Sequence, residues 1–317
     1  MATVNYANYL RMEKLPLYWC PGCGDGIVLK AYIEAIDELG WDKNDCAMVS
    51  GIGCASRVTG YVDFHTLHTL HGRALPTAVG VKMSHPDKHV FVFGGDGDIA
   101  HIGGNHFLHA CRRNIDITVV FIDNWNYGMT GGQHSCTTPL HVKESTAPRG
   151  SYEPPIDAAS AAIGAGATFV ARGFAGDELR MKRYIKEGLA HRGFSIIDIL
   201  CPCPINFGRR NKFGDPVKLM NYMKSLCIPK EKAEKMSPEE LEGKHITGVI
   251  HKDEKKTELT DSYYGWLVKT AQASDEYWAK YTTGRLKEED KYTITREELK
   301  GLYPYDLEIP LKKWKKL

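Results

Sequence analysis

Nine cysteines give this sequence its clearest capacity for chemistry, because a chain of 317 residues does not need disulfides to stabilise its core. Two of them form the motif Cys20-Pro21-Gly22-Cys23. This spacing suits a redox dithiol, half of a zinc site or half of an iron–sulfur site. We therefore expect some of the cysteines to bind a metal.

Two further cysteines follow apolar stretches that are typical of buried strands. Cys54 comes after residues 47–52, and Cys203 comes after residues 194–200. If both strands lie in one parallel sheet, their ends share an edge where four thiolates can converge. Cys201 competes with Cys203 as the fourth ligand, and zinc would also accept four thiolates. The remaining cysteines are expected to be small buried side chains: Cys46, Cys111, Cys136 and Cys227.

A glycine-rich turn, Gly95-Asp96-Gly97-Asp98, lies between an expected strand at 89–93 and an expected helix at 103–113. Glycines let the backbone approach a ligand closely, and free amides at the start of a helix can hold a diphosphate. The carboxylate of Asp96 is then left for a cation.

A second polar turn, Asp123-Asn124-Trp125-Asn126-Tyr127-Gly128, ends the next expected strand, 115–123. Asn124 offers a side-chain oxygen and Asn126 a backbone carbonyl, which with Asp96 make three hard ligands for Mg²⁺. This pairing of turns on consecutive strands is typical of thiamine diphosphate sites. Thiamine diphosphate forms electron-rich carbanions, so an electron carrier beside it has a role, whereas a structural zinc ion does not. We therefore favour an iron–sulfur cluster over zinc as the ligand of the cysteines.

The elements that must position these residues alternate between strand and helix, which predicts an α/β fold with a parallel sheet and helices on both faces. Ligands in such a fold bind at the carboxyl ends of the strands. The other expected helices are 25–39, 76–84, 156–166 and 176–187, the other expected strand is 169–172, and loops are expected at 65–73 and 135–155.

Composition changes after residue 207, where Lys, Glu and Tyr become frequent. We therefore expect a ligand-binding domain over 1–207 and a helical or irregular C-terminal extension over 208–317 that packs on partner subunits. With 41 basic and 39 acidic residues, the net charge of +2 gives no reason to expect nucleic acid or an anionic membrane as partner. The longest apolar stretches, such as 115–122, are too short to span a bilayer, and a cytoplasmic location is expected.

Together these motifs make the sequence resemble the β subunits of 2-oxoacid:ferredoxin oxidoreductases over residues 15–207. The resemblance rests on several motifs in one order: Trp19-Cys20-Pro21-Gly22-Cys23-Gly24-Asp25, Gly51-Ile52-Gly53-Cys54, H-T-L-H-G-R at 68–73, Gly95–Asp98, I-G-G-N at 102–105 and Y-G-M-T-G-G-Q at 127–133. It implies the thiamine-diphosphate-binding α/β fold.

The resemblance also implies roles for individual residues. A [4Fe–4S] cluster would be held by Cys20, Cys23, Cys54 and Cys203. Mg²⁺ would be held by Asp96, Asn124 and the backbone of Asn126, and the cofactor would be contacted by Gly53, Gly95, Gly97, Asp98, Gly128, Met129 and Thr130. His71 and Arg73 would face the cofactor, although packing for stability is an equal alternative for both.

The implied reaction is the coenzyme A-dependent oxidative decarboxylation of a 2-oxoacid, with electrons passing from thiamine diphosphate to the cluster and on to ferredoxin. A pyrimidine-binding domain with its activating glutamate is expected on an α subunit, and γ and ferredoxin-like δ subunits are expected as well. Gly131 stands where many family members carry Lys, and we prefer 2-oxoglutarate over 2-oxoisovalerate, pyruvate, aryl-2-oxoacids and oxalate as the substrate.

Two other functions compete with this one. The chain could be a non-catalytic iron–sulfur or zinc scaffold subunit, or a cluster-free thiamine decarboxylase or synthase. Thiamine content separates the first from the proposed enzyme, and iron and sulfide content separates the second.

Overall fold

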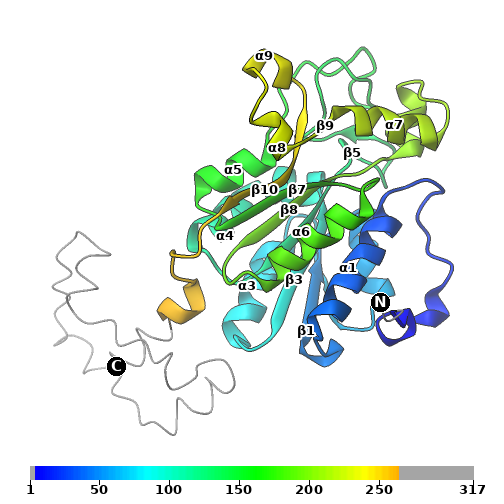
Figure 1. Cartoon of the computed structure of the whole chain (residues 1–317). Coiled ribbons are helices and arrows are strands. Elements are labelled where there is room, and N and C mark those ends of the chain that lie inside the picture. The colour runs from blue at the N-terminus through cyan, green and yellow to red at the C-terminus, as the bar shows by residue number, and fades with distance from the viewer. Residues whose placement is uncertain (1–3, 264–317) are drawn as a thin grey trace, which may run out of the picture. The chain divides into compact units, whose positions relative to one another are not determined.

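A single mostly parallel sheet forms the centre of the structure, a computed structural model that describes residues 4–263 (Figure 1). Its strand order is β2-β1-β3-β4-β8-β7-β10-β9. The strands are β1 (Cys46–Ser50), β2 (His65–His68), β3 (His89–Gly95), β4 (Thr118–Asp123), β7 (Phe169–Phe174), β8 (Ser195–Leu200), β9 (Cys227–Pro229) and β10 (His245–Lys252). The pairs from β2 through β7 are all parallel, whereas β10 runs antiparallel to β7.

Helices cover both faces of the sheet, as the sequence predicts. The helices α1 (Asp25–Leu39) and α6 (Glu178–Ala190) pack on one face, and α3 (Ala74–Ser84), α4 (Gly104–Arg113) and α5 (Ala158–Ala165) pack on the other (Figure 1). Strands β1, β4 and β8 are buried along their whole length. Burial on both faces explains why these segments are continuous apolar runs rather than alternating ones.

Short elements complete the fold. They are α2 (Val58–Tyr61), the two-stranded ribbon β5 (Asn126–Tyr127) and β6 (Gln133–His134), and the helical turns η1 (Tyr6–Asn8), η2 (Met12–Lys14), η3 (Lys43–Asp45), η4 (Ala55–Arg57), η5 (Gly97–Ile102) and η6 (Pro204–Gly208). In the segment 4–263, no helix has the length and apolarity required to cross a membrane.

One expected loop contains a strand. The sequence predicts a loop over 65–73, but residues 65–68 form β2, which pairs in parallel with β1 at one edge of the sheet. Most of β2 is solvent-exposed, so its residues lack the apolar pattern by which strands are recognised. The turn 69–73 therefore follows the carboxyl end of a parallel strand, as the other candidate loops do.

The sheet also continues beyond the boundary expected at 207. The residues that follow form α7 (Pro216–Leu226), α8 (Lys230–Ala233), α9 (Pro238–Leu241) and the strands β9 and β10, and the compact unit ends at Thr260. Strand β10 was missed because most of it is only half-buried and it contains a glycine and two histidines. The remainder of the extension expected over 208–317, residues 264–317, lies outside the described residues, and the packing of the extension on partner subunits stays a prediction.

Candidate functional site

Asp96 lies directly after β3 and is almost completely buried, with 1% of its surface exposed. One carboxylate oxygen accepts hydrogen bonds from Ser135 Oγ (2.6 Å) and Thr137 Oγ1 (2.7 Å). Burial raises the pKa of Asp96 to about 6, and the two hydroxyl groups act in the opposite direction. A buried carboxylate that is fixed by two donors is well suited to bind a cation.

The turn after β4 places two asparagines beside Asp96. Gly95 and Ile122 are paired in the sheet, so the residues that follow these two strands are neighbours. Within the turn, the Asn126 amide donates to Asn124 Oδ1 (3.3 Å) and Asn126 Nδ2 donates to Asn124 O (2.9 Å). Trp125 between them has a left-handed backbone (φ 64°). The three residues expected to bind Mg²⁺ thus lie on turns that follow neighbouring strands, and their binding of Mg²⁺ stays a prediction.

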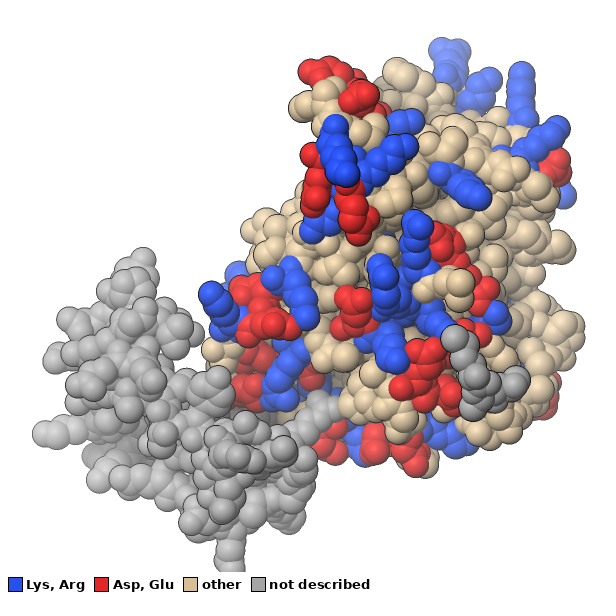
Figure 2. All heavy atoms as spheres, viewed as in Figure 1, with Lys and Arg blue, Asp and Glu red and all other residues tan. Residues whose placement is uncertain are grey.

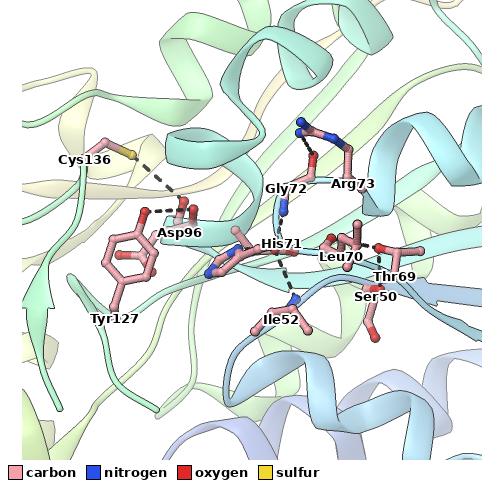
Figure 3. Close-up of polar contacts among 12 residues, drawn as sticks. Ser50, Ile52, Thr69, Leu70, His71, Gly72, Arg73, Asp96, Tyr127 and Cys136 are labelled. Carbon is pink, nitrogen blue, oxygen red and sulfur yellow. Dashed lines mark hydrogen bonds and ion pairs between the residues drawn. The ribbon is translucent and has the colours of Figure 1, made fainter. Parts of the chain in front are cut away.

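Asp98 connects three loops at this edge of the sheet. Its Oδ1 accepts from His71 Nδ1 (2.6 Å), from the Gly72 amide (2.8 Å) and from the Ile52 amide (3.2 Å). Figure 3 shows how His71 and its neighbouring turn approach the Asp96 and Tyr127 side of the site. The carboxylate of Asp98 would repel a diphosphate, so only the backbone of Asp98 is suited to contact the cofactor. That contact stays a prediction.

His71 and Arg73 differ in their surroundings. The His71 ring lies edge-on to Tyr127, with ring centroids 5.7 Å apart, and Tyr127 donates to Gly97 O (3.2 Å). Arg73 is exposed and donates to Gly72 O (3.3 Å). His71 is therefore positioned at the glycine-rich turn, whereas the contacts of Arg73 stay within its own turn (Figure 3).

Glycines in these loops leave room at the surface of the site. A side chain at Gly97 would collide with the Tyr127 ring, since its Cβ would lie 2.3 Å from a ring carbon. Gly53 has a backbone φ of +131° that favours glycine. Met129 and Thr130 are exposed on the adjoining loop, where Thr130 Oγ1 donates to Gln133 Oε1 (2.7 Å). Gly97 therefore allows the Tyr127 ring to pack against the turn, and the cofactor contacts expected of all these positions stay predictions.

Two of the expected cluster cysteines meet at Gly128. A Cβ at Gly128 would lie 3.4 Å from Cys203 Sγ and 3.7 Å from Cys54 Sγ. Cys203 Sγ also donates to Asn126 Oδ1 (3.7 Å). The two thiols, from the loops after β1 and β8, therefore lie next to the turn that carries the expected Mg²⁺ ligands.

The Cys20–Cys23 loop joins the same region. Trp19 Nε1 donates to Cys54 O (2.7 Å), which ties this loop to the loop after β1. Burial, followed by the charge of Asp25, raises the pKa of Cys23, and the thiols of Cys203 and Cys54 add to the effect. Burial likewise raises the pKa of Cys54 to about 12. Such thiols become good ligands only when a metal displaces their protons.

Cys201 and Cys203 occupy different environments. Cys201 is fully buried in the core and its Sγ donates to Asp25 Oδ1 (3.5 Å). Cys203 is only partly buried and lies beside Cys54, as described above. The geometry favours Cys203 as the fourth thiolate.

Four thiolates are a donor set that both a zinc ion and a [4Fe–4S] cluster accept. Within residues 4–263, no group of three or more His, Cys, Asp or Glu side chains is arranged so that it could hold a metal ion. The choice of a cluster over zinc therefore stays a prediction.

Sequence reasoning missed several residues of the site. Ser135 and Thr137 hold Asp96 from a loop 39 and 41 residues away, and the only signal was a concentration of hydroxyl side chains there. Glu144, in the same loop, is fully buried, and neither of its carboxyl oxygens has a hydrogen-bond partner among the described residues. Its Oε2 lies 3.4 Å from the position of a Cβ on Gly132, and burial raises its pKa to about 8.

Comparisons with known proteins agree with this geometry. Residues 51–199 match the family model described as "Thiamine pyrophosphate enzyme, C-terminal TPP binding domain". The chain is 48% identical over 262 residues to 2-oxoglutarate synthase subunit KorB of Methanothermobacter marburgensis, covering 83% of this chain and 92% of the relative. It is 46% identical over 186 residues to 2-oxoacid:ferredoxin oxidoreductase 2, subunit beta, of Aeropyrum pernix, covering 59% of this chain and 60% of that one.

A solved structure shares the fold over nearly the whole chain. It is the 2-oxoglutarate:ferredoxin oxidoreductase from Magnetococcus marinus with 2-oxoglutarate, coenzyme A and succinyl-CoA bound, with a TM-score of 0.77, 31% identity, and coverage of 90% of this chain and 97% of that chain. The expected fold class is thereby confirmed. With its thiamine-diphosphate-binding domain and relatives of this similarity, the chain belongs to the β subunits of the 2-oxoacid:ferredoxin oxidoreductases, a family of oxidoreductases.

Proposed function

We propose that this chain binds thiamine diphosphate with Mg²⁺ and one [4Fe–4S] cluster, and that with partner subunits it oxidatively decarboxylates a 2-oxoacid with coenzyme A as acyl acceptor. The electrons pass through the cluster to ferredoxin. The preferred substrate is 2-oxoglutarate. Asp96, Asn124 and the backbone of Asn126 hold Mg²⁺, and the cluster is held by Cys20, Cys23, Cys54 and Cys203.

The observation that carries this proposal is the position of Asn126. Its backbone belongs to the turn of the expected Mg²⁺ ligands, and its side chain accepts a hydrogen bond from Cys203. One residue therefore touches both the thiamine side and the thiol side of the site. Such proximity is what electron transfer from a cofactor to a cluster requires.

Bound thiamine diphosphate would supply the carbon chemistry, and the cluster would accept electrons one at a time. The contribution of this chain is to orient both groups. Ser135 and Thr137 hold the Asp96 carboxylate in place, and Asp98 fixes the turn that carries His71. Burial raises the pKa of the Cys203 thiol, and the backbone N–H groups of Phe207 and Asn206 act in the opposite direction.

The substrate preference has structural support at Gly131. This residue has no side chain to place a cation near a distal carboxylate, but Arg210 NH2 donates to Gly131 O (3.1 Å) from the segment after η6. The guanidinium group therefore restores a positive charge at this loop. The relatives named as 2-oxoglutarate synthase subunits, and the bound 2-oxoglutarate in the M. marinus enzyme, support the same preference.

Partner subunits are part of the proposal. We propose an α subunit with the pyrimidine-binding domain and its activating glutamate, and γ and ferredoxin-like δ subunits as further partners. The relatives named as subunits support an assembly of more than one kind of chain.

The test is an activity assay on the complex purified anaerobically with its native partners. Oxidation of 2-oxoglutarate, pyruvate, 2-oxoisovalerate, an aryl-2-oxoacid and oxalate is followed by reduction of methyl viologen, with and without coenzyme A. The proposal predicts coenzyme A-dependent reduction that is fastest with 2-oxoglutarate. If none of these 2-oxoacids is oxidised, the chain would be a non-catalytic scaffold subunit. If the complex is active but contains no iron or sulfide, it would be a cluster-free thiamine enzyme.

A further inference from the structure

The segment that follows the last cluster cysteine is strongly basic. Between Gly208 and Leu226 the chain has five basic residues and one acidic residue. Between Lys230 and Leu241 and the following turn to Lys244, by contrast, it has four basic and five acidic residues. Within residues 208–244, excess positive charge is therefore concentrated on residues 208–226.

Four of these cations form what we call the basic patch: Arg209, Lys212, Lys218 and Lys224, all of them exposed. In the described part of the chain, none of the four takes part in an ion pair. Lysines on the α1 and α6 face behave differently, since Lys30, Lys182 and Lys186 all pair with glutamates. Figure 2 shows mixed charges over α1 and α6 and mainly basic side chains near α7.

The basic patch adjoins the cluster cysteines at two points. A Cβ on Gly22, inside the Cys20–Cys23 loop, would lie 2.3 Å from Pro216 Cβ, so this loop packs on the first turn of α7. The turn η6 connects Cys203 directly to Arg209, and the Gly208 amide donates to Cys203 O (3.0 Å). The basic patch thus lies on the segment that packs against the Cys20–Cys23 loop, in which Cys20 is exposed.

Exposed apolar side chains accompany the charge. Tyr18, two residues before Cys20, is 78% exposed, and Val217 and Tyr222 on α7 are 67% and 40% exposed. Apolar contacts with a charged rim are typical of protein interfaces, and small ones suffice for transient redox encounters. The nearby acids are engaged, because Asp215 accepts from the Lys218 amide to cap α7 and Asp177 pairs with Arg180.

We infer that the basic patch, with Tyr18 and Val217, is the docking surface for an acidic electron-carrier protein. The inference rests on the proposed function, because it needs a cluster at Cys20, Cys23, Cys54 and Cys203. In the docked complex one electron leaves the reduced cluster and reduces the redox centre of the carrier, and no bond forms or breaks. Opposite charges accelerate such encounters and make them sensitive to salt.

The test compares two double charge reversals in the full complex. Arg209→Glu/Lys218→Glu alters the basic patch, and Lys232→Glu/Lys235→Glu alters two exposed lysines after β9 by the same total charge. Arg210 is left unchanged because it belongs to the proposed substrate site. Oxidation of 2-oxoglutarate is measured with an acidic ferredoxin and with methyl viologen, from roughly 10 mM to 1 M salt. The KM for coenzyme A and the size of the complex are measured in parallel.

The patch variant should raise the KM for ferredoxin about tenfold or more at low salt and lose most of its salt dependence, with the methyl viologen rate unchanged. The Lys232/Lys235 variant should match the wild type. An unchanged KM for ferredoxin would overturn the inference. A raised KM for coenzyme A would also overturn it, because the patch would then be a coenzyme A site. A complex that falls apart would overturn it as well, because the patch would then be a subunit interface. Absence of methyl viologen activity in the wild type would instead contradict the proposed function.

Discussion

Asp96 and Asp98 are fixed by donors within the chain, Asp96 by two hydroxyl groups and Asp98 by a histidine and two backbone amides. On the other side of the site, burial is the main reason that the pKa values of the Cys23 and Cys54 thiols are raised. The thiamine side is therefore organised before any ligand binds. On the proposed function, the thiol side would acquire its charge only when iron replaces the protons.

This difference implies that the two halves can be lost separately. They touch at Asn126 and Gly128, but the proposed Mg²⁺ ligands and the proposed cluster ligands come from different loops. Loss of one cofactor should therefore stop electron flow without removing the other cofactor.

Replacing Asp96 by Ala should abolish thiamine diphosphate binding and 2-oxoacid oxidation while the complex keeps its full iron content. The change removes the carboxylate that would hold Mg²⁺, whereas the thiols stay in place. Thiamine and iron analyses of the purified complex measure both. Asp87→Ala, at an exposed position, is the control. Retained thiamine in Asp96→Ala would show that this carboxylate is not the metal ligand.

Replacing Cys23 by Ala should do the opposite, with loss of the iron and sulfide of one cluster and of electron transfer, and with thiamine content preserved. A [4Fe–4S] cluster needs each of its four thiolates. Iron, sulfide and thiamine content, together with the reduced electron paramagnetic resonance spectrum, give the readout. Cys227→Ala changes a cysteine outside the thiol group and should keep both cofactors; a full cluster in Cys23→Ala would refute the ligand assignment.

Replacing Arg210 by Ala should raise the KM for 2-oxoglutarate about ten- to a hundredfold, the effect of losing one charge-assisted contact. The KM for pyruvate, which has no second carboxylate, should change little. Steady-state kinetics with methyl viologen provide the comparison, and Arg209→Ala is the neighbouring control. Equal effects on both substrates would mean that Arg210 supports the Gly131 loop without contacting the distal carboxylate.

Replacing Thr137 by Val should weaken Mg²⁺–thiamine diphosphate binding less than about tenfold, and more strongly at pH 6 than at pH 8. Thr137 lowers the pKa of Asp96, which burial has raised to about 6. Without this hydroxyl the carboxyl group keeps its proton to higher pH, and the protonated form cannot bind the cation. Calorimetric titrations of wild type and variant at both pH values test this, and a loss that is independent of pH would contradict it.

Replacing Glu144 by Gln should have the smallest effect, a gain in stability that appears only at high pH. Burial raises the folded-state pKa of Glu144 to about 8 from its ordinary value of 4.5. The folded chain therefore binds more protons than the unfolded chain between these values, and stability falls as the pH rises through this window. The variant removes that loss, about 1–3 kcal/mol for a buried group without partners.

Thermal unfolding of wild type and Glu144→Gln at pH 5 and pH 8.5 provides the measurement. The two proteins should unfold at similar temperatures at pH 5, and the variant should be more stable at pH 8.5. A constant difference at both pH values would mean that Glu144 does not change its ionisation in the folded state across this range.

Much of the fold follows from local sequence patterns, and the failures have physical causes. The buried parallel strands are apolar over their whole length, so β1, β4 and β8 were recognised. Strands at or next to the edges of the sheet, such as β2 and β10, are partly exposed and carry no such apolar pattern. The loops of the candidate site can also be recognised from local sequence, because they carry motifs of glycine, carboxylate and cysteine residues.

The residues that hold those motifs in place could not be found in the same way. Ser135 and Thr137 reach Asp96 only through the folded chain, and the role of Asp98 as an acceptor for the turn 69–73 and for the loop after β1 depends on where these two segments meet. Glu144 was missed because an acid in a polar loop gives no sign of burial.

The most direct test of the account is the content of iron, acid-labile sulfide, zinc and thiamine in the anaerobically purified native complex. The account predicts one thiamine diphosphate for each copy of this chain and one [4Fe–4S] cluster beyond those that the partners' sequences explain. Zinc in place of iron, or a complex without thiamine, would contradict it.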